Sequence, residues 1–115
     1  MSKFISGLLL KRIVEKYNID LIHANSEAAG IVAVKTRNKY KLDIPIVYTA
    51  HGVLPAKVKD IINQVDKIIA VSEFSRKSAI KEGFLAEKIQ VVYNGVDIEK
   101  FKPNRQNKNL LRKKI

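Results

Sequence analysis

Short apolar segments alternate with longer amphipathic segments along most of the chain. Four short segments predict strands, at residues 20–24, 45–50, 68–71 and 89–93, and all but the first are rich in β-branched residues, as is typical of strands covered on both faces. Four amphipathic segments precede these strands or lie between them, at residues 4–17, 27–38, 57–65 and 73–82. Strands that alternate with helices predict βαβ units and a parallel sheet. The predicted fold class is therefore α/β, a three-layer α/β/α Rossmann-like arrangement around a parallel sheet of about four strands.

The first amphipathic segment, residues 4–17, has an apolar residue at every fourth position. The repeating residues are Ile5, Leu9, Ile13 and Tyr17, and most charged residues lie on the other side of the helix. Such a stripe predicts a helix that packs on the sheet. The alternative is a helix that lies on a membrane surface, because its opposite face carries basic residues.

Capping residues mark where the other helices begin and end. Asn25 or Ser26 can cap the start of the second helix, and Ser72 can cap the start of the last one. Gly83 suits the position just after that last helix. Asn94-Gly95 is a turn signal after the last strand.

Polar or small residues follow or end each predicted strand. They are His23, His51 with Gly52, Ser72 with Glu73, and Asn94 with Gly95. In a parallel sheet the carboxyl ends of the strands lie along one edge, and ligands bind in the crevice there. His51 is the leading candidate for function, with Gly52 allowing a sharp turn or a close backbone approach to a ligand. His23 is expected to sit in a buried strand, where it packs or forms a hydrogen bond.

The chain is strongly basic, with a formal net charge of +11 from 22 Lys and Arg against 11 Asp and Glu. Six of the basic residues and none of the acidic ones fall within residues 102–115. Such a tail can bind nucleic acid or an anionic membrane surface, and a solvated terminus is the plainer interpretation. The aromatic residues fall mostly at core-like positions and form no base-stacking platform, which disfavours nucleic acid.

The absence of cysteine excludes disulfides, thiolate metal sites and cysteine nucleophiles, and it fits a reducing cytoplasm. The two histidines have no clustered ligands beside them, so no metal site is expected. The apolar run near the N-terminus is short and lacks a small-residue cleavage site, which argues against a signal peptide. The chain is therefore expected to be cytoplasmic, and peripheral contact with the inner face of an anionic membrane is the alternative.

Four motifs coincide with the four predicted strands and their ends. They are residues 20–26 (DLIHANS), 47–52 (VYTAHG), 66–73 (DKIIAVSE) and 88–97 (KIQVVYNGVD). Together and in this order they resemble the second half of the N-terminal, acceptor-side domain of family 4-like glycosyltransferases. Those are retaining enzymes with the GT-B architecture of two Rossmann-like domains, and the resemblance covers roughly residues 5–104.

The resemblance implies roles for individual residues. His51 matches the histidine that lies in the inter-domain cleft near the donor sugar, so it is the catalytic candidate. It could act as a general base or bond to a sugar hydroxyl, and the family resemblance favours the second role. Asn25 stands where the family's His-x-His motif has its second histidine. The substrate-binding residues that the resemblance implies are Gly52, His23, Ser72, Glu73, Asn94 and Gly95.

The family pattern also includes parts that are not recognised in this sequence. Family members generally have a glycine-rich loop upstream of this region, and a second domain that holds most of the nucleotide-sugar site. We therefore expect residues 1–104 to be a partial N-terminal domain, a truncated half of a GT-B enzyme, and residues 105–115 to begin the inter-domain region. A sugar acceptor (glycan or lipid) is the expected partner, with a separate chain carrying the donor domain. The nucleotide-sugar is a substrate, and no other cofactor is implied.

Two interpretations compete with a glycosyltransferase fragment. The first is a basic module that binds nucleic acid or anionic lipid through the tail, and the second is a non-functional remnant of a longer gene. Independently of these, missing upstream strands would leave one edge of the sheet open. An open edge predicts weak self-association.

Overall fold

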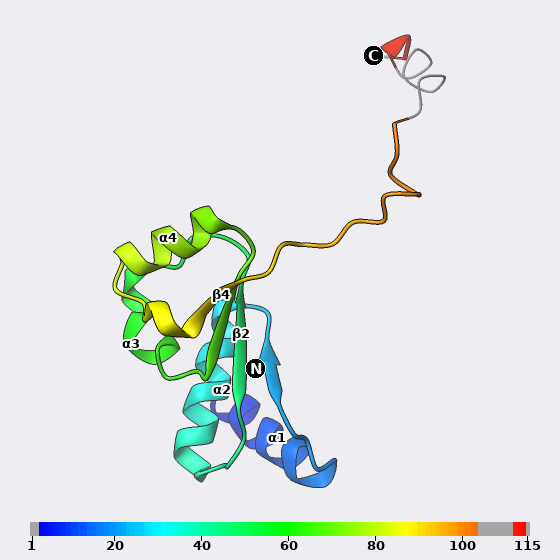
Figure 1. The fold of residues 1–115 in the computed structure, drawn as a ribbon. Coiled ribbons are helices and arrows are strands. Elements are labelled where there is room, and N and C mark those ends of the chain that lie inside the picture. The colour runs from blue at the N-terminus through cyan, green and yellow to red at the C-terminus, as the bar shows by residue number, and fades with distance from the viewer. Residues whose placement is uncertain (1–2, 104–111, 115) are drawn as a thin grey trace.

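The described residues, 3–103 and 112–114, alternate helices and strands in the expected order (Figure 1). In this computed structural model the strands are β1 (Ile22–Ala24), β2 (Ile46–Ala50), β3 (Lys67–Ala70) and β4 (Ile89–Val91). The helices are α1 (Lys3–Lys16), α2 (Glu27–Tyr40), α3 (Lys59–Ile62) and α4 (Glu73–Lys81), with 3₁₀ turns η1 (Ala56–Val58) and η2 (Ala86–Lys88). Most of the predicted basic tail at residues 105–115 lies outside the described residues.

The four strands form one sheet in the order β1-β2-β3-β4, and every neighbouring pair is parallel. Register is continuous across the sheet, with Tyr48 opposite Ile68 and Ile68 opposite Ile89. The predicted α/β class and the parallel Rossmann-like sheet of four strands are confirmed. Among the described residues, β1 and β4 are the edge strands, each paired with a neighbour on one side.

The core lies between the sheet and the helices. Its largest fully buried side chains come from strands (Ile46, Ile68) and from the helical side (Val34, Ile62, Val65). Sequential parallel strands joined by right-handed crossovers place every crossover on the same face of the sheet. On the opposite face Val47 and Ile69 are only partly buried. The described residues thus form two of the three expected layers, a sheet and one layer of helices.

Helix ends follow the expected capping residues. Ser26 caps α2 by accepting a hydrogen bond from the Ala29 N–H at 3.2 Å, so Ser26 rather than Asn25 is the cap. Gly83 follows α4 with φ of +92°, a conformation that favours glycine, and its N–H donates to the Ile80 carbonyl.

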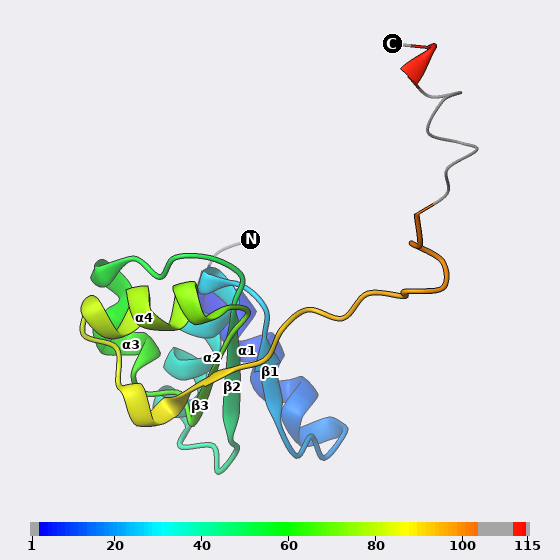
Figure 2. The same cartoon turned by 45° about the horizontal axis from the view of Figure 1, so that its top comes forward.

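The prediction of a turn at Asn94-Gly95 is wrong. Residues 92–97 form no turn, and the chain leaves the sheet here as an extended stretch (Figures 1 and 2). The turn comes later, at residues 98–101. The Asp97 carboxylate stabilises it by accepting hydrogen bonds from the Glu99 and Lys100 N–H groups at 3.0 Å.

The expected packing of the α1 stripe on the sheet is also wrong. Ile5, Leu9, Ile13 and Tyr17 are 52, 47, 40 and 61% exposed. The helix packs instead on α2, in a contact that includes Gly7 beside Thr36. The reason is tertiary, because β1 is an edge strand and no described strand lies beyond it to cover the stripe.

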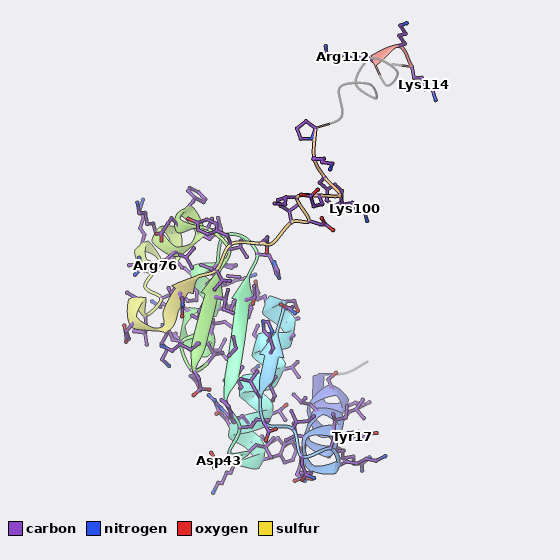
Figure 3. All side chains as sticks on the ribbon, turned by 45° about the vertical axis from the view of Figure 1, so that its right-hand side comes forward. Tyr17, Asp43, Arg76, Lys100, Arg112 and Lys114 are labelled. Atoms are coloured by element: carbon purple, nitrogen blue, oxygen red, sulfur yellow. The ribbon has the colours of Figure 1, made fainter. Side chains whose placement is uncertain are left out.

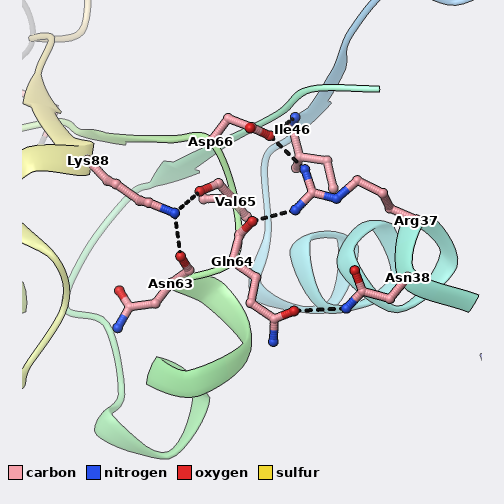
Figure 4. Close-up of polar contacts among 8 residues, drawn as sticks. All are labelled: Arg37, Asn38, Ile46, Asn63, Gln64, Val65, Asp66 and Lys88. Atoms are coloured by element: carbon pink, nitrogen blue, oxygen red, sulfur yellow. Dashed lines mark hydrogen bonds and ion pairs between the residues drawn. The ribbon is translucent and has the colours of Figure 1, made fainter. Parts of the chain in front are cut away.

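A polar network ties α2 to the amino ends of the central strands (Figure 4). Asp66 accepts hydrogen bonds from Arg37 Nη1 at 2.7 Å and from the Ile46 N–H at 2.8 Å. Arg37 also donates to the Gln64 carbonyl. Burial raises the pKa of Asp66, but the bond from Ile46 and the Arg37 side chain outweigh it, so the pKa lies below its ordinary value.

Asp66→Asn should therefore destabilise the fold in a pH-dependent manner. We expect it to lower the free energy of unfolding at neutral pH by about 1 kcal/mol, a modest value because the carboxylate is half exposed. A depressed carboxyl pKa stabilises the fold above its unfolded pKa, and this contribution is lost as the pH falls through the folded pKa. The difference between wild type and variant should thus begin to shrink below about pH 5 and continue to shrink as the pH falls through the depressed folded pKa.

Urea unfolding followed by circular dichroism at several pH values measures this difference. Glu99→Gln is the matched control, since the ion pair of Glu99 with Lys102 is exposed at both partners. The control should change stability by less than about 0.5 kcal/mol. A cost of Asp66→Asn that does not vary with pH would contradict the assigned role of the carboxylate.

Candidate functional site

The carboxyl ends of all four strands lie at one edge of the sheet, because every strand pair is parallel. His51 and Gly52 follow β2 directly, and Ser72 and Glu73 begin α4 just after β3. The topology thus brings the predicted residues of the two central strands to one edge. Such an edge is where ligands bind in open α/β sheets.

His23 takes part in a side-chain hydrogen bond across the sheet. Its Nε2 lies 2.7 Å from Thr49 Oγ1, which joins the edge strand β1 to β2. His23 is exposed, so the expectation of a buried environment is wrong, because β1 lies at the sheet edge. The expectation of a hydrogen-bonding role is consistent with this contact.

Thr49 is a site residue that the sequence analysis did not single out. It is only 7% exposed, and its hydroxyl meets the His23 ring in the strand that leads to His51. The available signal was a hydroxyl residue two positions before His51 in an otherwise apolar strand. Because Thr is β-branched and favours strands, its presence in β2 needed no further reason, and the hydrogen bond of its hydroxyl was not predicted.

His51 is exposed, and the space beside it is open. A Cβ built on Gly52 would meet no atom within 4 Å, and Gly52 does not have the positive φ seen at Gly83. The turn therefore does not require glycine at position 52. What glycine provides here is a bare backbone next to His51, over which a ligand could approach closely.

Ser72 serves the local fold, as its capping role predicts. Its Oγ accepts a hydrogen bond from the Ser75 N–H at 3.1 Å and donates to Ser75 Oγ at 3.0 Å. Glu73 is exposed in the first turn of α4, where it borders a polar hollow of about 450 Å³ beside β4. Arg76 and Lys88 line the same hollow.

Asn94 and Gly95 do not lie with His51 and Ser72 at the carboxyl edge of the central strands. They lie in the exposed stretch that leaves the sheet after β4 (Figure 2). A Cβ on Gly95 would meet no atom within 4 Å.

A second hollow, of about 220 Å³, lies between α1 and α2 and includes Gly7 and Tyr40 in its lining. His51 lines neither of these two hollows, and its side chain is exposed.

The described residues hold no group of three His, Asp or Glu side chains that could bind a metal ion. Within the same residues, no helix combines the length and the apolar character that a membrane span requires.

A protein-family model decides to which family the chain belongs. Residues 3–100 match the model described as Glycosyltransferase Family 4. The chain belongs to this family. The match includes all four strands and both histidines, so the resemblance found in the strand-end motifs is confirmed. No curated protein sequence matches the chain significantly.

Solved structures show the same fold. HepE of Anabaena in complex with UDP-glucose superimposes with a TM-score of 0.74 at 28% identity, over 92% of this chain and 32% of that one. A glycosyltransferase from Rickettsia africae gives a TM-score of 0.70 at 22% identity, over 97% and 32% of the two chains. A UDP-N-acetylglucosamine 2-epimerase from Rickettsia bellii gives 0.61 at 20% identity, over 96% and 32%.

These relatives differ in what they support. At 22% and 20% identity the two rickettsial proteins show the shared fold alone. In every case the chain spans about a third of the length of the solved protein that it matches. The family 4 chain described here thus corresponds to one part of such proteins, and the activity of a whole enzyme is a matter for proposal.

Proposed function

We propose that this chain forms the acceptor-side part of a retaining glycosyltransferase that moves a hexose from a nucleotide-sugar to a glycan or lipid acceptor. The observation that carries the proposal is the position of His51 in a family 4 domain. It is exposed at the carboxyl end of β2, with the open backbone of Gly52 beside it. HepE, which shares this fold at 28% identity, has a structure with UDP-glucose.

In this proposal His51 is the catalytic residue and forms a hydrogen bond with a hydroxyl of the donor sugar. An imidazole ring has nitrogens that can donate or accept such a bond. The 2.7 Å contact between His23 and Thr49 supports a rigid strand pair next to it. The N-terminus of α4, beginning at Ser72 and Glu73, offers backbone N–H groups toward the anionic part of the donor.

The proposal assigns this chain one wall of the cleft. Residues 1–104 form the acceptor-side unit, residues 105–115 lead toward the donor side, and Asn94 and Gly95 lie on that path. A separate chain carrying the donor domain would complete the site, so the isolated chain should be inactive. We place the protein in the cytoplasm, with an acceptor presented in solution or at the inner membrane face.

A chimaera with HepE tests the proposal. Residues 3–100 of this chain would replace the matched third of HepE, and UDP release from UDP-glucose, with water as the acceptor of the glucosyl group, would be followed in a coupled assay. We expect measurable turnover by the chimaera and none by the isolated chain. Intact HepE is the positive control, and circular dichroism with UDP-glucose titration confirms that the chimaera is folded and binds the donor.

Two results would count against the proposal. Turnover by the isolated chain would show that it is more than one wall of a cleft. A chimaera that folds and binds UDP-glucose but releases no UDP would show that this chain cannot supply the catalytic residue.

A basic binding module is the second candidate, favoured by the charge of +11. Arg112, Lys113 and Lys114 are exposed, as such a module requires. Deletion of residues 104–115 should then abolish binding to anionic vesicles at low salt. Binding that survives the deletion would remove the tail from consideration.

A further inference from the structure

The hollow between α1 and α2 has no part in the function proposed above. It has a volume of about 220 Å³, and its lining comes from Gly7 of α1 and from the stretch 31–40 of α2. Figure 3 shows α1 beside the part of α2 that leads to Asp43, before the amino end of β2. His51 follows the carboxyl end of β2, so the hollow is a separate feature of the surface.

The interior of the hollow is mostly apolar. Ile31 and Val32 line it and are partly buried. A Cβ added to Gly7 would lie 3.0 Å from Thr36 Oγ1, so the absence of a side chain lets the two helices approach closely here. Apart from lysines, the polar side chains among the described lining residues are Thr36 and Tyr40. Such an interior suits an aliphatic group and offers few hydrogen-bond partners to a sugar or a nucleotide.

Positive charge gathers around the hollow. Lys35 and Lys39 line it, both are exposed, and they are four residues apart on α2. The Nζ atoms of Lys11 and Lys39 lie 5.6 and 5.2 Å from the centre of the Tyr40 ring. Lys11 forms an ion pair with Glu15 at 2.7 Å, so the excess charge comes from the two lysines of α2. Among the described residues, no acidic side chain lines the hollow.

We propose that this hollow binds a small anionic amphiphile, with one aliphatic chain in the apolar interior and a carboxylate head at Lys35 and Lys39. Like charges four residues apart on a helix repel each other, and a carboxylate beside both lysines replaces this repulsion with attraction. The hollow is smaller than the roughly 300–1,000 Å³ usual for drug-sized ligands, so it suits a single short chain. The net charge of +11 attracts such an anion from solution.

A lipid bilayer fits the hollow less well than a single molecule in solution. A bilayer also supplies apolar chains and anionic heads, but a helix binds to it through apolar side chains that project into the membrane surface. The apolar side chains that line the hollow, Ile31 and Val32, are partly buried and form a recess. A recess of this size accommodates one chain, so a lipid would have to leave the bilayer to fill it.

Calorimetric titration of the full chain with hexanoate, octanoate and decanoate, each below the concentration at which it forms micelles, tests the proposal. Each added methylene group should raise the affinity by up to about fourfold while it enters the hollow, and the rise should stop once the chain outgrows the hollow. Octanol, which has the same chain without the charge, should bind about tenfold or more weakly than octanoate. The amide NMR signals of Gly7 and of residues 31–40 should shift on binding.

Matched variants locate the head and the chain of the ligand. Lys35→Gln combined with Lys39→Gln should weaken octanoate binding about tenfold or more. Lys77→Gln combined with Lys81→Gln removes two exposed lysines at the same spacing from α4 and should leave binding unchanged. Val32→Phe places a larger side chain in the hollow and should abolish the binding of both octanoate and octanol. Circular dichroism of the free variants confirms that they are folded.

Several outcomes would overturn the proposal. The first is no binding of any of the three carboxylates. Equal weakening by the two lysine pairs would show that only the net charge of the chain matters. Binding that Val32→Phe leaves intact would place the ligand outside the hollow, and binding to phosphatidylglycerol vesicles without binding of octanoate would assign this surface to a bilayer. No sugar enters these measurements, so their failure leaves the proposal for His51 untouched.

Discussion

Replacing His51 with alanine in the HepE chimaera is expected to lower kcat for UDP release from UDP-glucose by roughly a hundredfold or more. A hydrogen bond to a sugar hydroxyl that strengthens in the transition state can supply several kcal/mol, so its loss has an effect of about this size. KM should change much less, because a bond formed mainly in the transition state contributes little to ground-state binding. His51 is exposed and accepts substitution without loss of core packing.

A second variant separates the two roles considered for His51. His51→Gln keeps a side chain that can donate and accept hydrogen bonds but cannot take up a proton. If His51 holds a sugar hydroxyl, we expect His51→Gln to recover part of the activity lost in His51→Ala. If His51 is a general base, the two variants should be equally impaired.

The control for these variants is Lys81→Ala. Lys81 is exposed at the far end of α4 from Ser72, so its loss should leave UDP release unchanged. Wild-type activity in His51→Ala would remove His51 from the catalytic machinery. The exposed position after β2 would then need another explanation, such as acceptor recognition.

Replacing Ile68 with alanine is expected to lower the free energy of unfolding by about 2–5 kcal/mol. Ile68 is fully buried in β3, paired between Tyr48 of β2 and Ile89 of β4. Truncation removes apolar contacts and leaves a cavity that a rigid sheet cannot close. A domain of this size is stable by only about 5–15 kcal/mol, so the loss is a large fraction of its stability.

Urea unfolding followed by circular dichroism measures the effect as a lower midpoint. Ile98→Ala is the matched control, because this isoleucine is 73% exposed after β4 and should cost less than about 0.5 kcal/mol. Equal costs for the two variants would mean that β3 does not organise the core.

The sequence was most informative where structure depends on neighbours along the chain. The serine before α4 caps it because a side-chain oxygen and a backbone N–H three residues apart meet in any such helix start. Gly83 ends the same helix because glycine adopts a positive φ without a steric cost. The alternation of strands and helices then determined the parallel sheet and brought His51 to its carboxyl edge.

Predictions failed where a residue's surroundings come from distant parts of the chain. The stripe of Ile5, Leu9, Ile13 and Tyr17 has the pattern of a buried helix face, yet it is exposed. His23 was expected in a buried strand, yet β1 lies at the edge of the sheet. Periodicity shows which residues share a face, but it carries no information on what lies opposite that face.

By itself, the sequence determined the α/β class, the positions of most helices and strands, and the single edge at which His51 and Ser72 lie. Only the tertiary structure decided that His23 meets Thr49, that Asp66 joins Arg37 to the Ile46 backbone, and that the α1 stripe beside β1 is uncovered. The physical reason is the separation along the chain of the residues that interact. Caps and strand propensities act over a few residues, whereas these contacts join residues 20 or more apart or depend on which strand has no neighbour.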